Sequence, residues 1–345
     1  MLYGCGVNTK QVLGRAALGG VMVGLSIGAA AKVAGHRVRR RHEAGLDRLL
    51  DRPLGLREHS VATHDGGTVH LVEAAGDGRP VMLLHGVTLQ WWVWSALITE
   101  LRDTHRVLAW DMRGHGQSVA GTEGVSIEAA AHDLATVLET LDLKEVIVVG
   151  HSMGGMELGR FAVQHPGVLA ERVAGSVFLA TSASSSSIRG IAGGLIAFSA
   201  ATSRGAVAGL RNPRLALRWR DNDATAALVR FAFGRRPTAK MVDDVRRMLA
   251  DMPQQSLAEA GASIADHDVR SEVHAVRIPT LVIVGDRDTL TPPGHARELA
   301  RLIDGAELQV LPSVGHQVMQ EAPELLAESI EKFSARLDAD PPGHG

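Results

Sequence analysis

The sequence has almost no cysteine, no excess charge of either sign and no internal repeat. Cys5 is the one cysteine among 345 residues, so an internal disulfide is excluded. Lys and Arg total 36 against 38 for Asp and Glu, and the net charge of −2 argues against a basic, nucleic-acid-binding chain. A chain of this length matches one core domain with an insertion, preceded by an N-terminal segment.

A metal-binding pattern is also lacking. Among the 16 histidines, His59, His64 and His70 form the closest set. Their spacing matches no zinc pattern, and one cysteine supplies no thiolate set. We therefore expect no metal site, and the chemistry inferred below requires no cofactor.

The most informative stretch that is present places a serine at the end of a buried strand. The run from Glu145 to Gly155 is apolar and β-branched, then reads Gly-His-Ser-Met-Gly around Ser152, and a helical pattern follows to His165. A serine at such a strand-to-helix turn has its Oγ exposed above the sheet, and small residues at 150 and 154 let the turn close. The start of the helix offers free N–H groups where negative charge would develop.

Two further loops supply partners for this serine. Asp288 follows the strand-like run 279–284, and His316 follows the strand-like run 306–311. The chain order Ser, Asp, His is the one expected for a hydrolase of this kind. In that arrangement His316 takes the proton from Ser152 and returns it to the leaving group, while Asp288 orients the imidazole.

With these motifs the chain resembles the α/β-hydrolase fold family, over roughly residues 57 to 337. The resemblance rests on the His85-Gly86 turn, the loop 111–118, the Ser152 motif and the paired Asp288 and His316 loops. It implies an α/β fold with a mostly parallel, doubly wound sheet and a helical cap insertion.

The resemblance also decides between two candidate acids. The family places the acid three residues after the glycine that ends the strand, which favours Asp288 over Asp286, a turn-capping residue in this interpretation. Some relatives carry the acid after the preceding strand, but no Asp or Glu occurs between Arg172 and Arg220. The other histidines inside the motifs, His115 and His151, are interpreted as structural braces of loops near the serine.

Backbone N–H groups of Val87 and Met153 are the expected oxyanion hole. The substrate pocket is expected to include His85, Gly86, Trp91 and Trp92. Trp91, Trp92 and Trp94 begin a helical pattern that extends to Leu101, and helical spacing predicts that they do not all face inward.

A serine nucleophile makes acyl transfer from an ester, thioester or lactone the natural chemistry, so we expect a carboxylesterase- or lipase-like hydrolase. Three alternatives stay open. They are a C–C bond hydrolase, a cofactor-free haloperoxidase-like enzyme and a non-catalytic, ligand-binding scaffold of the same fold.

The N-terminus is the second informative region. No charged residue occurs from Ala16 to Ala31, and basic residues flank this run on both sides. Gly20, Gly24 and Gly28 recur at helical spacing, which suits close helix contact in lipid. We expect membrane association through residues 16–34, with the catalytic domain on the cytoplasmic side because positive charge follows the segment. The alternative is a packed N-terminal helix in a soluble cytoplasmic protein.

The chain is thus divided into five segments. We expect an N-terminal segment (1–50), the first part of the core (51–182), a helical lid or cap (183–270), the second part of the core (271–337) and a disordered tail (338–345). Six arginines and no acid occupy the lid before Asp221. Such a lid could lie on an anionic membrane and admit lipid-like esters, or it could be an ordinary cap with solvated arginines.

Overall fold

Eight strands form one sheet in the order β1-β2-β4-β3-β5-β6-β7-β8. The computed structural model describes residues 36–38, 40–185, 226–227 and 229–339. β2 runs antiparallel to both of its neighbours, β1 and β4, and all other neighbouring strands are parallel. The predicted mostly parallel, doubly wound sheet is therefore confirmed. The strands are β1 (Arg57–Ala62), β2 (Thr68–Ala74), β3 (Pro80–Leu84), β4 (Arg106–Trp110), β5 (Val146–His151), β6 (Val173–Leu179), β7 (Thr280–Gly285) and β8 (Glu307–Leu311).

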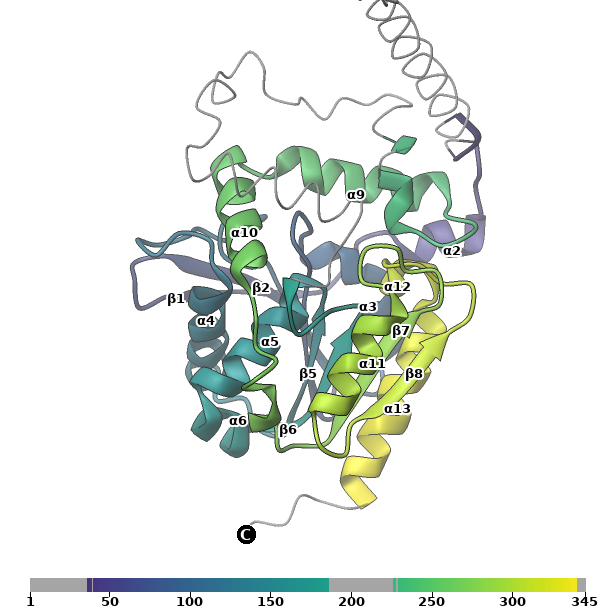
Figure 1. Cartoon of the computed structure of the whole chain (residues 1–345). Helices are drawn as coiled ribbons and strands as arrows, with labels where there is room; N and C mark the ends of the chain where they lie inside the picture. The colour runs from purple at the N-terminus through teal and green to yellow at the C-terminus, as the bar shows by residue number, and fades with distance from the viewer. Residues whose placement is uncertain (1–35, 39, 186–225, 228, 340–345) are drawn as a thin grey trace, which may run out of the picture.

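Helices alternate with the strands and cover both faces of the sheet (Figure 1). The α-helices are α2 (Ala44–Leu49), α3 (Ser95–Leu101), α4 (Ile127–Thr140), α5 (Met153–Gln164), α6 (Pro166–Arg172), α9 (Ala239–Asp251), α10 (Gln254–Asp266), α11 (Pro293–Leu302), α12 (Val318–Glu321) and α13 (Pro323–Ala339). Short 3₁₀ helices are η1 (Trp91–Trp94), η4 (Arg230–Ala232) and η5 (Val273–Ala275).

Two hydrophobic cores lie on opposite faces of the sheet because side chains alternate along each strand. In β3, Val81 and Leu83 join the core beneath α3 and α13, whereas Met82 and Leu84 join the core beneath α4, α5 and α11. All four side chains are fully buried. Strands buried on both faces read as continuous apolar runs, which is why the sequence pattern located them so directly.

The insertion between β6 and β7 contributes η4, α9, α10 and η5 to the described structure. Met252 and Ile264, at the end of α9 and in α10, pack in one apolar cluster with Met153 and Met156 at the start of α5. The insertion therefore lies beside the predicted serine. Residues 186–225 and 228, which include most of the arginine-rich part of the expected lid, lie outside the described residues, and the segment boundaries stay predictions.

The expected membrane segment, residues 16–34, also lies outside the described residues, as do residues 340–345 at the end of the expected tail. Within the part of the chain that the structure describes, no helix is long and apolar enough to cross a membrane.

The tryptophan prediction was wrong, because all three side chains are buried. Trp91, Trp92 and Trp94 expose 9%, 6% and 0% of their surfaces. The expected helix begins as the 3₁₀ turn η1, in which residues three apart lie above one another, so Trp91 and Trp94 share one side. The Arg52 guanidinium lies over two of the rings, 4.6 Å from the ring centre of Trp92 and 5.9 Å from that of Trp91.

Candidate active site

Ser152 occupies a strained turn between β5 and α5. Its φ of +53° and ψ of −116° form a conformation that costs a non-glycine residue about 1–3 kcal/mol. The surrounding backbone imposes it. The Ser152 N–H donates to the Leu179 carbonyl at 3.0 Å, and the Ser152 carbonyl accepts from the Thr181 hydroxyl at 2.6 Å. Strain held in this way is typical of functional positions, and here it belongs to the predicted nucleophile.

The glycines on either side of Ser152 are required by space, as the motif predicted. A Cβ at Gly150 would lie 2.5 Å from the Gly154 carbonyl oxygen, and a Cβ at Gly154 would lie 2.5 Å from the Leu84 carbonyl oxygen. Both distances are far inside van der Waals contact. The turn therefore closes only with hydrogen at these positions, which holds the start of α5 against the end of β3.

Asp288 and His316 meet in a buried hydrogen bond. His316 Nδ1 lies 2.9 Å from Asp288 Oδ2, and the two residues expose 3% and 4% of their surfaces. Asp288 also accepts hydrogen bonds from the Leu290 and Thr291 N–H groups and from the Thr291 hydroxyl. Four donors around two oxygens suit a carboxylate, and a proton on Nδ1 leaves His316 Nε2 with a free lone pair. This is the state that a general base needs.

Asp286 has a different environment. Its Oδ1 accepts the Ser313 N–H at 2.6 Å, so the side chain braces the turn after β8. This geometry agrees with the interpretation of Asp286 as a turn-capping residue.

His151 joins the serine turn to the histidine loop. Its ring centre lies 4.7 Å from that of His316, and its Nε2–H donates to the His316 carbonyl oxygen at 3.0 Å. Complete burial, with the nearby His316 adding to it, lowers the pKa of His151 well below its usual range, so the ring stays neutral. The predicted bracing role of His151 fits these contacts.

The turn after β3 lies directly against Ser152. A Cβ at Gly86 would come within 2.9 Å of the Ser152 Cβ. The N–H groups of Val87 and Met153 have no acceptor among the residues that the structure describes. Two unpaired donors beside the serine have the chemistry of an oxyanion hole, and that role stays a prediction.

Two buried histidines hold this turn in place. His85 Nε2 accepts the Met112 N–H at 3.0 Å, and His115 Nε2 accepts the Thr88 N–H at 3.2 Å. Burial, with the nearby His85 adding to it, lowers the pKa of His115 to about 3. Both rings therefore accept hydrogen bonds as neutral imidazoles and link the turn to the loop after β4.

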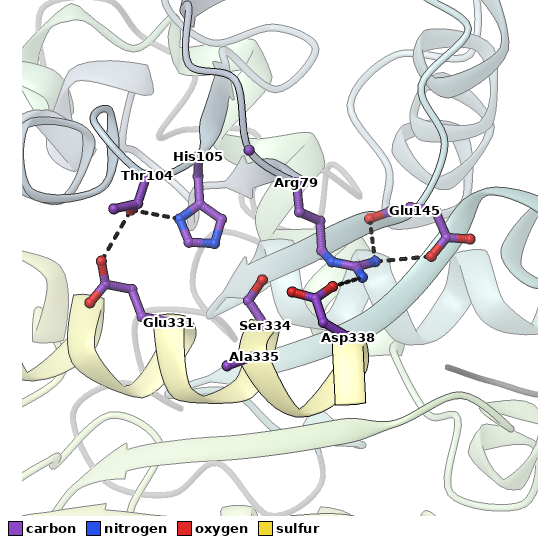
Figure 2. A pocket seen from close by; sticks show the side chains of 9 residues that line it. Arg79, Thr104, His105, Glu145, Glu331, Ser334, Ala335 and Asp338 are labelled. Atoms are coloured by element: carbon purple, nitrogen blue, oxygen red, sulfur yellow. Dashed lines mark hydrogen bonds and ion pairs between the residues drawn. The ribbon is translucent and has the colours of Figure 1, made fainter. Parts of the chain in front are cut away.

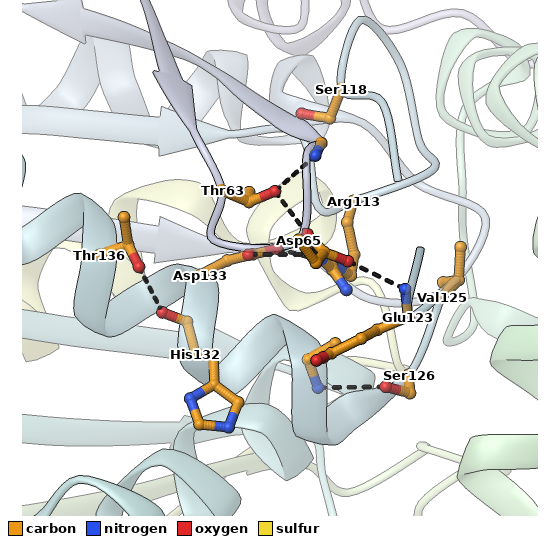
Figure 3. Close-up of polar contacts among 12 residues, drawn as sticks. Thr63, Asp65, Arg113, Ser118, Glu123, Val125, Ser126, His132, Asp133 and Thr136 are labelled. Carbon is orange, nitrogen blue, oxygen red and sulfur yellow. Dashed lines mark hydrogen bonds and ion pairs between the residues drawn. The ribbon is translucent and has the colours of Figure 1, made fainter. Parts of the chain in front are cut away.

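That loop is in turn anchored by Arg113 (Figure 3). The guanidinium is fully buried and donates to Asp133 and Asp65, each at 2.8 Å. Burial raises the pKa of Asp133 to about 6 although Arg113 opposes the shift. The network fixes the loop that carries Met112 and His115, and through them the turn beside Ser152.

The predicted pocket residues lie near the serine but are tightly packed. His85 is fully buried with both ring nitrogens bonded, since its Nδ1 lies 2.7 Å from the Gly86 carbonyl oxygen. Trp91 and Trp92 pack in the core shared by α3 and the insertion. That His85, Gly86, Trp91 and Trp92 line a substrate pocket stays a prediction.

The three histidines considered for a metal each contact a carboxylate instead. His59 lies 2.7 Å from Glu73, His64 lies 3.0 Å from Glu123, and His70 lies 3.1 Å from Asp111. No group of three His, Cys, Asp or Glu side chains within the described ranges is arranged to hold a metal ion.

Two residues at the site were not found from the sequence. Thr291 donates to Asp288, and Glu321 accepts N–H groups from two loops at the site. An Asp followed three residues later by Thr is a local signal that could have indicated the first contact. Nothing in the sequence indicated the second, because Gly234, the partner that ties Glu321 to the insertion, lies 87 residues away in the chain.

Comparisons with known proteins agree with this geometry. Residues 79–323 match the family model described as alpha/beta hydrolase fold. The AB hydrolase superfamily protein YisY of Bacillus subtilis is 27% identical over 282 residues, which cover 80% of this chain and 98% of that protein. A non-heme haloperoxidase of Rhodococcus erythropolis is 29% identical, with 74% of this chain and 91% of that protein covered.

A solved structure gives the same result. A thermophilic esterase from Thermogutta terrifontis superimposes with a TM-score of 0.66 at 25% identity, covering 81% of this chain and 99% of that one. The family match extends over more than half of the chain and includes Ser152, Asp288 and His316. The chain belongs to the α/β hydrolase fold family.

Proposed function

We propose that this protein is a serine hydrolase that cleaves carboxylic esters through an acyl-enzyme. The observation that carries the proposal is the buried Asp288–His316 hydrogen bond beside the strained turn of Ser152. Hydrolase chemistry is common to the family, and the similarity to a thermophilic esterase supports an ester as substrate.

In the proposed mechanism Ser152 Oγ attacks the ester carbonyl carbon while His316 Nε2 takes its proton. The Val87 and Met153 N–H groups stabilise the oxyanion, and Asp288 stabilises the imidazolium. Collapse breaks the bond to the alcohol, which leaves with the proton from His316. Water, deprotonated by the same nitrogen, then releases the acid and restores Ser152.

The apolar cluster beside Ser152 supports a substrate with an apolar acyl group. Met153, Met156 and Met252 pack there, with Val87 and Leu257 at the margin. Thioether side chains adapt to irregular apolar shapes, which suits variable acyl groups. A lipid-like ester is the finer form of the proposal, and it depends on membrane association through residues 16–34. Retention of the full-length protein in washed membranes would support that association, and complete release by salt would contradict it.

The haloperoxidase-like alternative has one observation in its favour, the similarity to the Rhodococcus haloperoxidase. The same acyl-enzyme attacked by peroxide instead of water would give a peracid. Turnover that requires peroxide and a carboxylic acid, without ester hydrolysis, would favour this reading over the esterase.

The deciding experiment is fluorophosphonate labelling of wild type and Ser152→Ala, together with hydrolysis of p-nitrophenyl esters of increasing chain length. We expect labelling and turnover in the wild type and neither in the variant, and the chain-length optimum distinguishes small from lipid-like esters. Absence of both in folded wild-type protein would refute the hydrolase proposal and favour a binding scaffold.

A further inference from the structure

Glu321, at the end of α12, bridges two backbone segments that are far apart in the sequence. Its Oε2 accepts the Gly234 N–H at 2.7 Å, and its Oε1 accepts the Gly315 N–H at 3.0 Å. Gly234 follows η4 in the insertion, and Gly315 directly precedes His316. One carboxylate therefore links the insertion to the loop that carries the proposed general base.

The segment 231–234 and the histidine loop form a close backbone contact around this carboxylate. The Ala232 carbonyl oxygen accepts the N–H groups of both His316 and Gln317, at 2.9 and 3.2 Å. A Cβ at Gly234 would lie 2.5 Å from the Ser313 carbonyl oxygen. The position of His316 is thus set partly by the insertion, and not by the sheet alone.

The insertion also contacts the loop that carries the acid. The Thr289 hydroxyl donates to the Phe231 carbonyl oxygen at 2.9 Å, one residue from Asp288. Both partners of Ser152 therefore lie in loops that the segment 231–234 touches.

We propose that Glu321 is a positioning residue whose carboxylate holds the His316 loop against the insertion, so that its protonation loosens the loop and lowers activity. The inference rests on the proposed role of His316 as general base. Glu321 would then affect catalysis although it lies outside the Ser-His-Asp set. Through Glu321 the insertion would also influence the position of His316.

The contact requires the charged form of Glu321 because both partners are N–H donors. A carboxylate offers an acceptor to each, whereas a neutral carboxyl or an amide offers one acceptor and one donor, and the donor would face an N–H group. The charged groups that act on Glu321 are Arg230 of η4, which favours the carboxylate, and Asp288, which opposes it. Arg41 acts on Arg230 in turn.

Together these groups and the burial of Glu321 place its pKa near neutral pH. Burial, with the negative charge of Asp288 adding to it, outweighs the hydrogen bonds from Gly234 and Gly315 and raises the pKa of Glu321 to about 7. The carboxylate is present above this pH and is lost as the pH falls through it. Activity that depends on the bridge should fall in the same interval.

The test compares wild type with Glu321→Gln by kcat and KM for a p-nitrophenyl ester from pH 5.5 to 8.5. At pH 8.5 we expect kcat of the variant to be about tenfold lower with KM nearly unchanged, since a displaced base impairs the chemical step more than binding. The ratio of wild-type to variant activity should shrink towards 1 as the pH falls through about 7. Taking the ratio removes the pH effects that are common to both proteins. Glu328→Gln, on the exposed face of α13 where Glu328 pairs with Lys332, is the matched control and should change nothing.

A second measurement keeps the proposal testable if the variant does not fold. In the wild type, hydrogen exchange of the peptide that contains Gly315 and His316 should lose protection between pH 8 and 6, relative to a peptide from β5. Constant protection, or a folded Glu321→Gln variant with wild-type activity at every pH, would overturn the proposal. Wild-type protein without Ser152 labelling would instead indicate failure of the proposed hydrolase function.

Discussion

The two edges of the sheet gather the same kinds of residues and differ in what surrounds them. At the carboxyl ends of the strands lie Ser152, Asp288, His316 and the Arg113 network. At the amino ends, just before β3, β4 and β5, a cleft of about 500 Å³ is lined by residues that include Arg79, His105 and Glu145 (Figure 2).

Each edge has an arginine that bonds two carboxylates, which makes the contrast direct. The Arg113 side chain and its partners Asp65 and Asp133 are at most 3% exposed. Arg79 pairs with Glu145 and Asp338, whose side chains are 57% and 66% exposed. Water screens the second set. Positive φ does not separate the two edges, since Glu145 beside the cleft has a φ of +55° and Ser152 a φ of +53°. Burial, not residue type, distinguishes the candidate site.

The largest expected effect is on kcat, and it should distinguish Asp288 from Asp286, which both lie at the carboxyl edge. Asp288→Asn should lower kcat by about 10³–10⁴, because an amide cannot hold His316 in the tautomer that acts as a base. Asp286→Asn should change kcat by no more than a few-fold, since Asp286 contacts the turn at Ser313 and the neighbouring Arg287, and not His316. Steady-state ester hydrolysis measures both. Equal effects of the two substitutions would mean that the wrong acid has been assigned.

The second-largest expected effect is on stability, and it should distinguish Arg113 from Arg79. Arg113→Ala should lower the free energy of unfolding by about 3–5 kcal/mol, because it leaves buried Asp65 and Asp133 without their cation. Urea denaturation at pH 7.5 measures this loss. A loss below about 1 kcal/mol would show that the two edges are energetically alike.

The buried histidines at the carboxyl edge predict a pH dependence of stability. The pKa of His115 is about 3 in the folded protein, lowered chiefly by burial, and about 6.5 in an unfolded chain. Below about pH 6.5 the unfolded state binds a proton that the folded state does not, so stability falls by up to about 1.4 kcal/mol per pH unit.

His115→Asn should therefore be less stable than wild type at pH 8, and the difference should shrink by about 2 kcal/mol on going to pH 5. Urea midpoints and slopes at the two pH values give the difference. A constant difference would mean that the pKa of His115 is the same in the folded and the unfolded protein.

The smallest expected effect lies at the amino edge. Arg79→Ala should change the free energy of unfolding by about 0–1 kcal/mol, because exposed ion pairs contribute little, and should leave ester hydrolysis unchanged. The comparison with Arg113→Ala uses the same residue type and the same substitution. A strong loss of activity in Arg79→Ala would reveal a role for the cleft of Figure 2 that its exposure does not suggest.

Much of the fold and of the serine turn could be predicted from local sequence patterns. The buried runs before Gly150 and Gly285 located strands, and glycines around Ser152 located the sharp turn, because these features depend on neighbours in the chain. The mostly parallel sheet and the family followed from the same motifs, whereas the order of the strands in the sheet was not predicted. The burial of all three tryptophans did not follow, since it depends on Arg52 and on the 3₁₀ geometry of η1.

The sequence alone determined the fold class and the sharp turn at Ser152, because strand and turn propensities act over a few residues. The resemblance to the family indicated Asp288 and His316 as partners of Ser152, and that assignment stays a prediction. Only the tertiary structure decided which groups hold these residues in place. The His151–His316 contact, the Arg113 network and the Glu321 bridge join positions separated by 20 to 165 residues, or meet through the insertion. The spacing of these residues in the sequence does not predict such contacts, since they form only after the sheet has brought its loops to one edge.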